Sequence, residues 1–475
     1  MKKVLVIAYF FPPYAGVGAH RSSQIVRHLR EFGYEPIVLT TAKGTFARDP
    51  LRPVGEDEDS LKRVPPDVMV YRSPAFQPFA LIRLLSRMRL MWLYHWFARP
   101  DEKVTWCLPA IIEGYRIARR HEIDLIYSLP AGAFSTTFVG VALKWLLRKP
   151  LIIDMQDPFT QWPMGVWPTR LHYHLDRLIE RVVLGSADAI NMVWETYRDE
   201  IVASQPSLAR KRIVWIHNGF DPAETERMRT EAEGAPPKDP RVMTIMHSGV
   251  FYDRWGKLDP ADRPSGLKRL YRATIGRLRY KPLDVDYEVH SPRLLMRAIS
   301  ELKRERPEIG ANIRFNLTGN SDPAIRQLAR ELGIEDQVNV LGFVSRKEYL
   351  RHLFGADLRL LPMSRFRNGQ KMGWLVLKMY DYLQTCAPIL VLSDNSTTRD
   401  ICLRAGTGIA VKPDDLDEMK RALTRLYEEH VTGGIRVTPD RDYLRRFEWR
   451  NVVRRVAELC DETLANRSRA KGNPA

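Results

Sequence analysis

Short runs of apolar residues alternate with stretches of helical periodicity along most of this chain, and the alternation predicts its fold class. Runs at 3–9, 36–40, 124–128 and 150–155 are each long enough for one strand buried on both faces. Between such runs, apolar residues recur every three or four positions, which is the spacing of an amphipathic helix. Strands and helices in this order are typical of a doubly wound parallel α/β sheet.

The same alternation starts again near residue 241, with strands expected at 242–247, 313–317, 338–341 and 357–361. A chain of 475 residues is also too long for one ordinary core. We therefore predict two Rossmann-like domains. Their expected parts are a first domain at 1–221, a linker at 222–240, a second domain at 241–447 with a basic insertion at 255–289, a helix at 448–465 crossing back to the first domain, and a flexible tail at 466–475.

Composition and charge narrow the class of protein and its partners. Hydrophobic residues make up 44% and charged residues 28%, as in an ordinary globular protein. The four cysteines lack the spacing of a zinc site or a disulfide framework, which fits a reducing cytoplasm. No apolar run approaches the roughly 20 residues of a membrane span. The formal charge of +17 favours anionic partners: a lipid surface, a nucleic acid or a phosphate-bearing substrate.

An arm at 78–99 combines bulky apolar residues and tryptophans with interspersed arginines. The arginines exclude a spanning helix, whereas a basic amphipathic helix with tryptophans suits the membrane–water interface. The alternative is an arm that packs across its own domain. One interpretation predicts peripheral attachment to the inner face of the plasma membrane, and the other predicts no membrane contact.

Polar and small residues follow several predicted strands, where open α/β sheets bind ligands. Gly16 and Gly18 come after the first strand, and glycines at a helix start let backbone amides approach a phosphate or sugar. His20 follows them, and it could shuttle a proton, bond a phosphate or cap the next helix. Arg21 stands where the dinucleotide fingerprint would place its third glycine. Asp157 lies just beyond the strand at 150–155.

The pattern at 373–383 predicts a helix, and a turn and a buried strand are expected directly after it. It carries Lys378 and Asp381, three residues apart and so on neighbouring positions of the helix surface. A carboxylate can accept two strong hydrogen bonds from a vicinal diol such as a ribose.

These segments together resemble the retaining family 4 glycosyltransferases, which have the GT-B fold of two Rossmann-like domains facing a cleft. The Lys-x-x-Asp-Tyr-Leu sequence at 378–383 is similar to that family's helix, and Gly373 replaces its first acidic residue. The Phe-Pro-Pro-x-x-Gly-x-Gly-x-x-Arg loop at 11–21, the Asp-x-Gln-Asp-Pro segment at 154–158 and the Asn-Gly-Phe-Asp turn at 218–221 also match, in the family's order.

The resemblance implies transfer of a hexose from a nucleotide-sugar to an acceptor hydroxyl with retention of configuration. Asp381 would hold the ribose, and Arg254, assisted by Lys378 or Lys371, would neutralise the leaving diphosphate. It further assigns the donor to Gly16, Gly18, Gly249, Arg254, Phe343, Lys378 and Asp381, and the catalytic roles to Asp157, His20 and Arg254.

Neither a cofactor nor a metal is expected, because the Asp-x-Asp sequences at 57–59 and 284–286 lie in charged, loop-like surroundings. The acceptor would be a glycan or a lipid-linked intermediate of cell-envelope or polysaccharide synthesis. Two alternatives stay open: a nucleotide-sugar epimerase on the same fold, and a nucleotide-sugar-binding protein whose catalysis is impaired, as Gly373 allows. Only the charge favours nucleic acid, so we do not expect it as a partner.

Overall fold

The computed structural model describes residues 1–14, 16, 18–45, 56–76, 78–88, 90–232, 239–252, 274–319 and 323–472. These residues form two compact α/β units. The first unit contains 1–218, 274–283 and 449–472, and the second contains 219–252 and 284–448. The predicted fold class, two doubly wound α/β domains, is confirmed.

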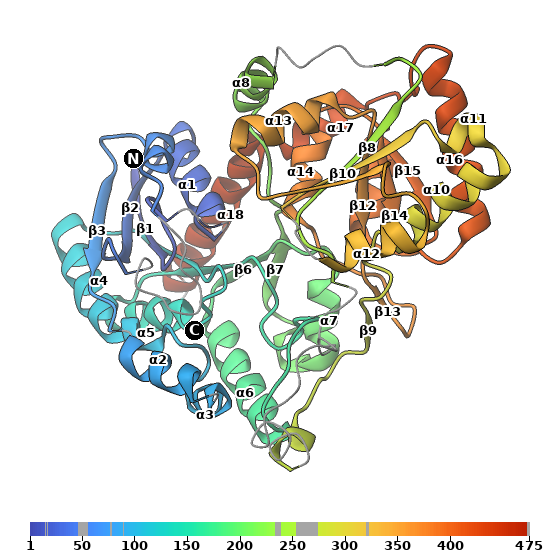
Figure 1. Ribbon diagram of the computed structural model, residues 1–475. Helices are drawn as coiled ribbons and strands as arrows, with labels where there is room; N and C mark the ends of the chain where they lie inside the picture. The colour runs from blue at the N-terminus through green and yellow to red at the C-terminus, as the bar shows by residue number, and fades with distance from the viewer. Residues whose placement is uncertain are drawn as a thin grey trace. The chain divides into compact units, whose positions relative to one another are not determined.

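The first unit is built on a parallel sheet with the strand order β3-β2-β1-β4-β5-β6-β7 (Figure 1). The order changes direction between β1 and β4, so this is the switch point where such sheets bind ligands at their carboxyl ends. The strands are β1 Lys2–Ala8, β2 Tyr34–Thr41, β3 Met69–Ser73, β4 Leu125–Leu129, β5 Leu151–Met155, β6 Ala189–Met192 and β7 Arg212–Trp215.

Helices cover the faces of this sheet. Helices α4 and α5 pack against each other and against strands at its centre, while α1 packs against α18. Apolar residues of α18 at helical spacing, Val452, Val453 and Val456, join Val4 and Val6 of β1 in one buried core. The helices are α1 Gly18–His28, α2 Phe79–Arg87, α3 Met91–Phe97, α4 Cys107–His121, α5 Thr136–Leu147, α6 Arg170–Ser186, α7 Tyr197–Ser204 and α18 Trp449–Gly472.

The second unit repeats the plan with a parallel sheet of order β11-β10-β8-β12-β14-β15, whose switch point lies between β8 and β12. A separate antiparallel pair joins β9 (Val285–Asp286) and β13 (Arg365–Phe366). The sheet strands are β8 Met243–Ser248, β10 Ile313–Thr318, β11 Val338–Gly342, β12 Leu358–Pro362, β14 Ile389–Leu392 and β15 Gly408–Val411. The helices are α8 Pro222–Ala232, α10 Arg293–Glu305, α11 Pro307–Gly310, α12 Pro323–Glu331, α13 Arg346–Gly355, α14 Leu377–Leu383, α15 Thr397–Arg404, α16 Leu416–Val431 and α17 Arg441–Leu444.

Three segments differ from the sequence prediction. The expected linker begins with helix α8, which packs against α13 within the second unit. The arm at 78–99 is two short helices, α2 and α3, instead of one continuous helix. The final helix continues to Gly472, through most of the residues expected to be a flexible tail, and Arg467 within that range donates to the carbonyl of Arg148.

The basic insertion also divides between the units. Tyr280, inside the range expected to belong to the second domain, forms two backbone hydrogen bonds of 2.8 and 2.9 Å with Trp167 of the first unit. Its ring lies 5.0 Å from that of Tyr173 and under the guanidinium of Arg170 at 5.4 Å.

In the parts of the chain that the structure describes, no helix is both long and apolar enough to cross a bilayer.

Candidate active site

Three glycine-bearing loops meet at the carboxyl edge of the second sheet. Gly249 follows β8 with φ +105°, and Gly319 follows β10 with φ +76°, both in the region that glycine adopts without strain. The amide of Gly249 donates to the carbonyl of Thr318 at 2.9 Å, and the amide of Gly319 donates to that of Gly342 at 2.6 Å. A Cβ on Gly319 would lie 3.3 Å from the nitrogen of Gly249. The loops therefore touch through their backbones, next to the switch point.

Lys378 of α14 points at this edge. Its Nζ would lie 3.1 Å from a Cβ added to Gly249 and is 3.4 Å from Nε2 of His247, at the end of β8. Burial lowers the pKa of Lys378 to about 8. Among the described residues, no carboxylate forms an ion pair with this ammonium. A desolvated cation with no carboxylate counter-ion among the described residues is suited to an anionic ligand.

His247 supports the lysine without competing for anions. Its Nδ1 lies 2.9 Å from the carbonyl oxygen of Leu360, and its ring stacks on Phe251 at 4.3 Å. Burial, and next the charge of Lys378, lower the pKa of His247 well below its usual range. The imidazole is therefore neutral at pH 7, and the positive charge is concentrated on Nζ.

Asp381 lies one turn further along α14 and has different partners from Lys378. Its carboxylate accepts hydrogen bonds of 3.3 Å from the Tyr349 hydroxyl and from the Gln384 amide. Burial raises the pKa of Asp381 to about 6. The residue as a whole is half-buried. The predicted pair thus has two separate sets of neighbours.

An aromatic cluster lines the loop that contains Gly373. The Tyr252 ring stacks on Trp374 at 5.6 Å and meets the edge of His290 at 4.5 Å. His290 is fully buried; its Nδ1 lies 3.3 Å from the Ser364 hydroxyl, while its Nε2 has no hydrogen-bond partner among the residues described. Where the resemblance has an acidic residue, this chain therefore has an apolar and aromatic wall.

Of two further residues predicted to contact the donor, Phe343 and Arg254, the structure describes only Phe343. Phe343 follows β11 and is 89% exposed, so its ring is accessible for stacking on a flat ligand. Arg254 lies outside the described residues.

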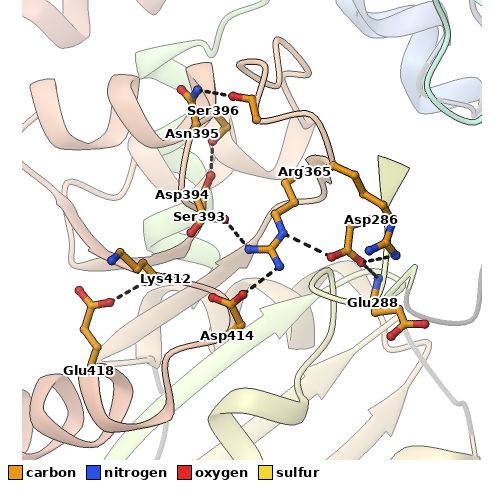
Figure 2. A network of polar contacts seen from close by, with 12 residues as sticks. Asp286, Glu288, Arg365, Ser393, Asp394, Asn395, Ser396, Lys412, Asp414 and Glu418 are labelled. Carbon is orange, nitrogen blue, oxygen red and sulfur yellow. Dashed lines mark hydrogen bonds and ion pairs between the residues drawn. The ribbon is translucent and has the colours of Figure 1, made fainter. Parts of the chain in front are cut away.

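Arg365 connects the β9–β13 pair to the neighbouring loops (Figure 2). Its guanidinium bonds to Asp286 at 3.3 Å, Asp394 at 2.7 Å and Asp414 at 2.8 Å. Asp286 is one of the two acidic residues of the Asp-x-Asp sequence at 284–286. Asp286 lies in strand β9, whereas the sequence predicted a loop there. Its carboxylate forms ion pairs with Arg365 and Arg367. Within the described ranges, no group of three or more His, Cys, Asp or Glu side chains is placed to hold a metal.

In the first unit, the glycines after β1 accommodate aromatic rings. A Cβ on Gly16 would come within 2.4 Å of the Tyr14 ring, and one on Gly18 within 3.1 Å of Phe10. Phe10 and Tyr14 stack at 4.6 Å. The loop is therefore tightly packed where it enters α1, and a side chain at Gly16 or Gly18 would require the Tyr14 or Phe10 ring to shift.

Arg21 is the buried centre of this loop region, a role that the sequence did not indicate. Its Nε bonds to Asp154 of β5 at 3.0 Å, and Nη1 donates to the carbonyl of His217 and to Oδ1 of Asn218. Asp154 also accepts from the side chain of Asn191 at 2.7 Å. Arg21 therefore ties α1 directly to β5 and to the end of β7, and Asp154 extends the network to Asn191 of β6.

The two catalytic candidates of the first unit each follow a strand of its sheet, His20 near the start of α1 and Asp157 in the loop after β5. The His20 ring meets the edge of Trp449 at 5.5 Å and is half-buried. Asp157 is half-buried, and burial raises its pKa to about 6. A carboxyl with a pKa near 6 can exchange a proton near neutral pH, as Asp157 would.

Comparison with known proteins identifies the family. Residues 16–219 match the model of the glycosyl transferase 4-like domain, and residues 274–429 match that of glycosyl transferases group 1. No curated protein matches the chain.

Solved structures agree on the fold at low sequence identity. Anabaena HepE, in complex with UDP, is 14% identical with a TM-score of 0.55, over 97% of this chain and all of that one. Sucrose-phosphate synthase of Thermosynechococcus elongatus is 13% identical with a TM-score of 0.53, over 98% of this chain and all of that one. The lipopolysaccharide outer core galactosyltransferase WaaB is 13% identical with a TM-score of 0.52, over 97% of this chain and all of that one. The chain belongs to the group 1 glycosyltransferases and is a sugar-transferring enzyme with the two-domain GT-B fold.

Proposed function

We propose that the sugar donor is a nucleotide-sugar and that the second unit binds it at the carboxyl edge of β8. The observation that carries this proposal is the desolvated ammonium of Lys378 against the backbone of Gly249, at the switch point of the sheet. HepE, which shares the fold, has been determined with UDP and with UDP-glucose.

Each part of the donor has a candidate partner in this unit. Lys378 neutralises charge on the diphosphate, together with Arg254, whose guanidinium fork suits phosphate oxygens. The carboxylate of Asp381 accepts hydrogen bonds from the ribose hydroxyls. The exposed ring of Phe343 stacks on the base.

The reaction that we propose retains the anomeric configuration. The bond between the anomeric carbon and the diphosphate oxygen breaks as the acceptor oxygen bonds to the same face of that carbon. The acceptor proton passes to the departing phosphate oxygen, so no protein base is obligatory. We assign acceptor orientation to the first unit, where Asp157 and His20 offer groups that hold a hydroxyl.

Activity is expected to be independent of a divalent metal, because cationic side chains supply the charge that a metal would otherwise neutralise. The purified chain, treated with EDTA, is incubated with common nucleotide-sugars, and mass spectrometry detects the products. We expect release of the nucleoside diphosphate at an unchanged rate. Loss of release with EDTA and recovery with Mn²⁺ would contradict metal independence, and an epimerised nucleotide-sugar would favour the epimerase.

The pH dependence of kcat/KM is expected to be bell-shaped, with limits near 6 and 8. Asp381 must be ionised to accept from the ribose, so activity rises as pH passes the raised pKa of about 6. Lys378 must be protonated, so activity falls above its lowered pKa of about 8. In the pH profile, Lys378→Arg should remove the alkaline limb and Asp381→Asn the acid limb. An unchanged acid limb in Asp381→Asn would assign it to Asp157 instead, whose pKa is also about 6.

The acceptor that we propose is a glycan or a lipid-linked intermediate, met at the inner face of the membrane. Support comes from the α2–α3 arm, where Leu81, Leu84 and Met88 are about half exposed beside arginines. Such a surface suits peripheral attachment to an anionic bilayer.

A further inference from the structure

The outward face of α6 carries an apolar stripe that neither the donor site nor the acceptor site uses. Leu171, Leu175, Leu178 and Val182 are 64%, 49%, 51% and 58% exposed. Their spacing of four, three and four residues places them along one side of the helix. Aliphatic residues at this spacing ordinarily face a core, yet the core-facing side of α6 is occupied by other buried residues, among them Tyr173 and Val183. The helix is therefore apolar toward solvent as well as toward the sheet.

The exposed charges of α6 are all of one sign. Both acidic residues of the helix, Asp176 and Glu180, are buried. Its exposed ionisable residues are Arg170, His174 and Arg181. The outward face of α6 thus combines aliphatic side chains with cationic ones.

The α2–α3 arm joins this surface, because it packs directly on α6. The Trp96 ring of α3 meets the edge of the His172 ring at 4.9 Å, and Nε of Arg99 donates to Asp176 at 3.3 Å. The packing side of the arm buries Ile82 and Tyr94. The arm therefore packs on its own unit through one side, as the packing alternative for 78–99 predicted, and exposes leucines on the other side.

We propose that the α6 stripe lies in the headgroup region of an anionic lipid bilayer, with the α2–α3 arm beside it. Aliphatic side chains on a surface helix bury at the acyl boundary, while arginines extend to lipid phosphates. A second copy of the chain fits less well: a two-fold interface would set this cationic face against itself, with the acidic residues of α6 buried. The inference rests on the proposed membrane attachment and assigns its main contact to α6.

Sedimentation of the full chain with lipid vesicles tests the inference. The wild type should bind vesicles of phosphatidylcholine with phosphatidylglycerol, bind pure phosphatidylcholine less, and be released as salt rises from about 50 to about 500 mM. Leu175→Gln with Leu178→Gln should lower the partition coefficient about tenfold, since two half-exposed leucines lose their apolar contact. The matched control is Leu403→Gln with Val431→Gln, at exposed apolar positions of α15 and α16 in the second unit, and should bind like the wild type.

Release of nucleoside diphosphate from the donor in detergent-free solution separates this inference from the proposed function. The α6 variant should keep that activity while it loses vesicle binding. Equal vesicle binding by the α6 variant and its control would overturn the inference, as would a wild type that fails to bind anionic vesicles at low salt. A dimer, detected by light scattering and dissociated by the α6 substitutions, would also overturn it, because the stripe would then be a contact between copies.

Discussion

Lys378→Met is expected to lower kcat/KM by about 10²–10³, the usual cost of removing one preorganised group that stabilises developing negative charge. Methionine keeps an unbranched side chain of similar length in a desolvated position, so folding should be preserved. The reason for a large effect is the burial of the ammonium, which lies against Gly249 and a neutral imidazole. Charge in such surroundings acts more strongly than charge at the surface.

Lys371→Met is the matched control for this prediction. Its ammonium pairs with Asp400 at 3.0 Å and is partly exposed, and the sequence alone did not separate it from Lys378 as the residue that assists. Steady-state kinetics on the two variants should show a loss for Lys378→Met and a change within a few-fold for Lys371→Met. Equal effects, or a mild effect of Lys378→Met, would remove the lysine from the donor site.

Arg21→Met is expected to lower the free energy of unfolding by about 3–5 kcal/mol, the usual cost of breaking a buried ion pair from one side. The side chain is 1% exposed, and its removal leaves the Asp154 carboxylate buried without its cation. Two acceptors at the end of β7, the carbonyls of Ile216 and His217, also lose a donor. A protein unit of this size should lose on the order of 10 °C in melting temperature.

Arg212→Met is the corresponding control at the surface. Arg212 pairs with Glu462 at 3.1 Å in the same unit, with both side chains more than half exposed. Such pairs contribute about 0–1 kcal/mol, so its melting temperature should stay close to that of the wild type. Thermal unfolding followed by circular dichroism compares the two. If the two variants have the same melting temperature, the buried network around Arg21 does not stabilise the loop after β1.

The apolar pattern predicted both sheets because a parallel strand covered on both faces is a continuous apolar run, as in β1 and β14. The pattern did not predict β3, an edge strand that is only half-buried along most of its length. Helix α4 was missed for a different reason. Its outward face exposes Leu108 and Ile112, which weakens the contrast between apolar and polar sides on which helix prediction depends.

For the site, residue types could be predicted from the sequence but their contacts could not. Lys378 and Asp381 could be placed on one helix from spacing alone, whereas the approach of Lys378 to Gly249 depends on how distant segments pack. Arg21 stood out as a departure from a glycine fingerprint and as the end of the family-like loop at 11–21, whereas its structural role depends on β5 and the end of β7. His247 ends an apolar strand, with no sign in the sequence of its contact with Lys378.

The proposed function depends above all on one binding step, in which the second unit holds the diphosphate of a nucleotide-sugar beside Gly249 and Lys378. Calorimetric titration can measure this step with uridine, guanosine, adenosine and thymidine diphosphates, each compared with its own nucleoside at pH 7. At least one diphosphate should bind at least about 100-fold more tightly than its nucleoside, the lower limit expected from two charged hydrogen bonds of about 1.5–3 kcal/mol each. If all four diphosphates bind no better than their nucleosides, the second unit is not a diphosphate site and the proposed function is contradicted.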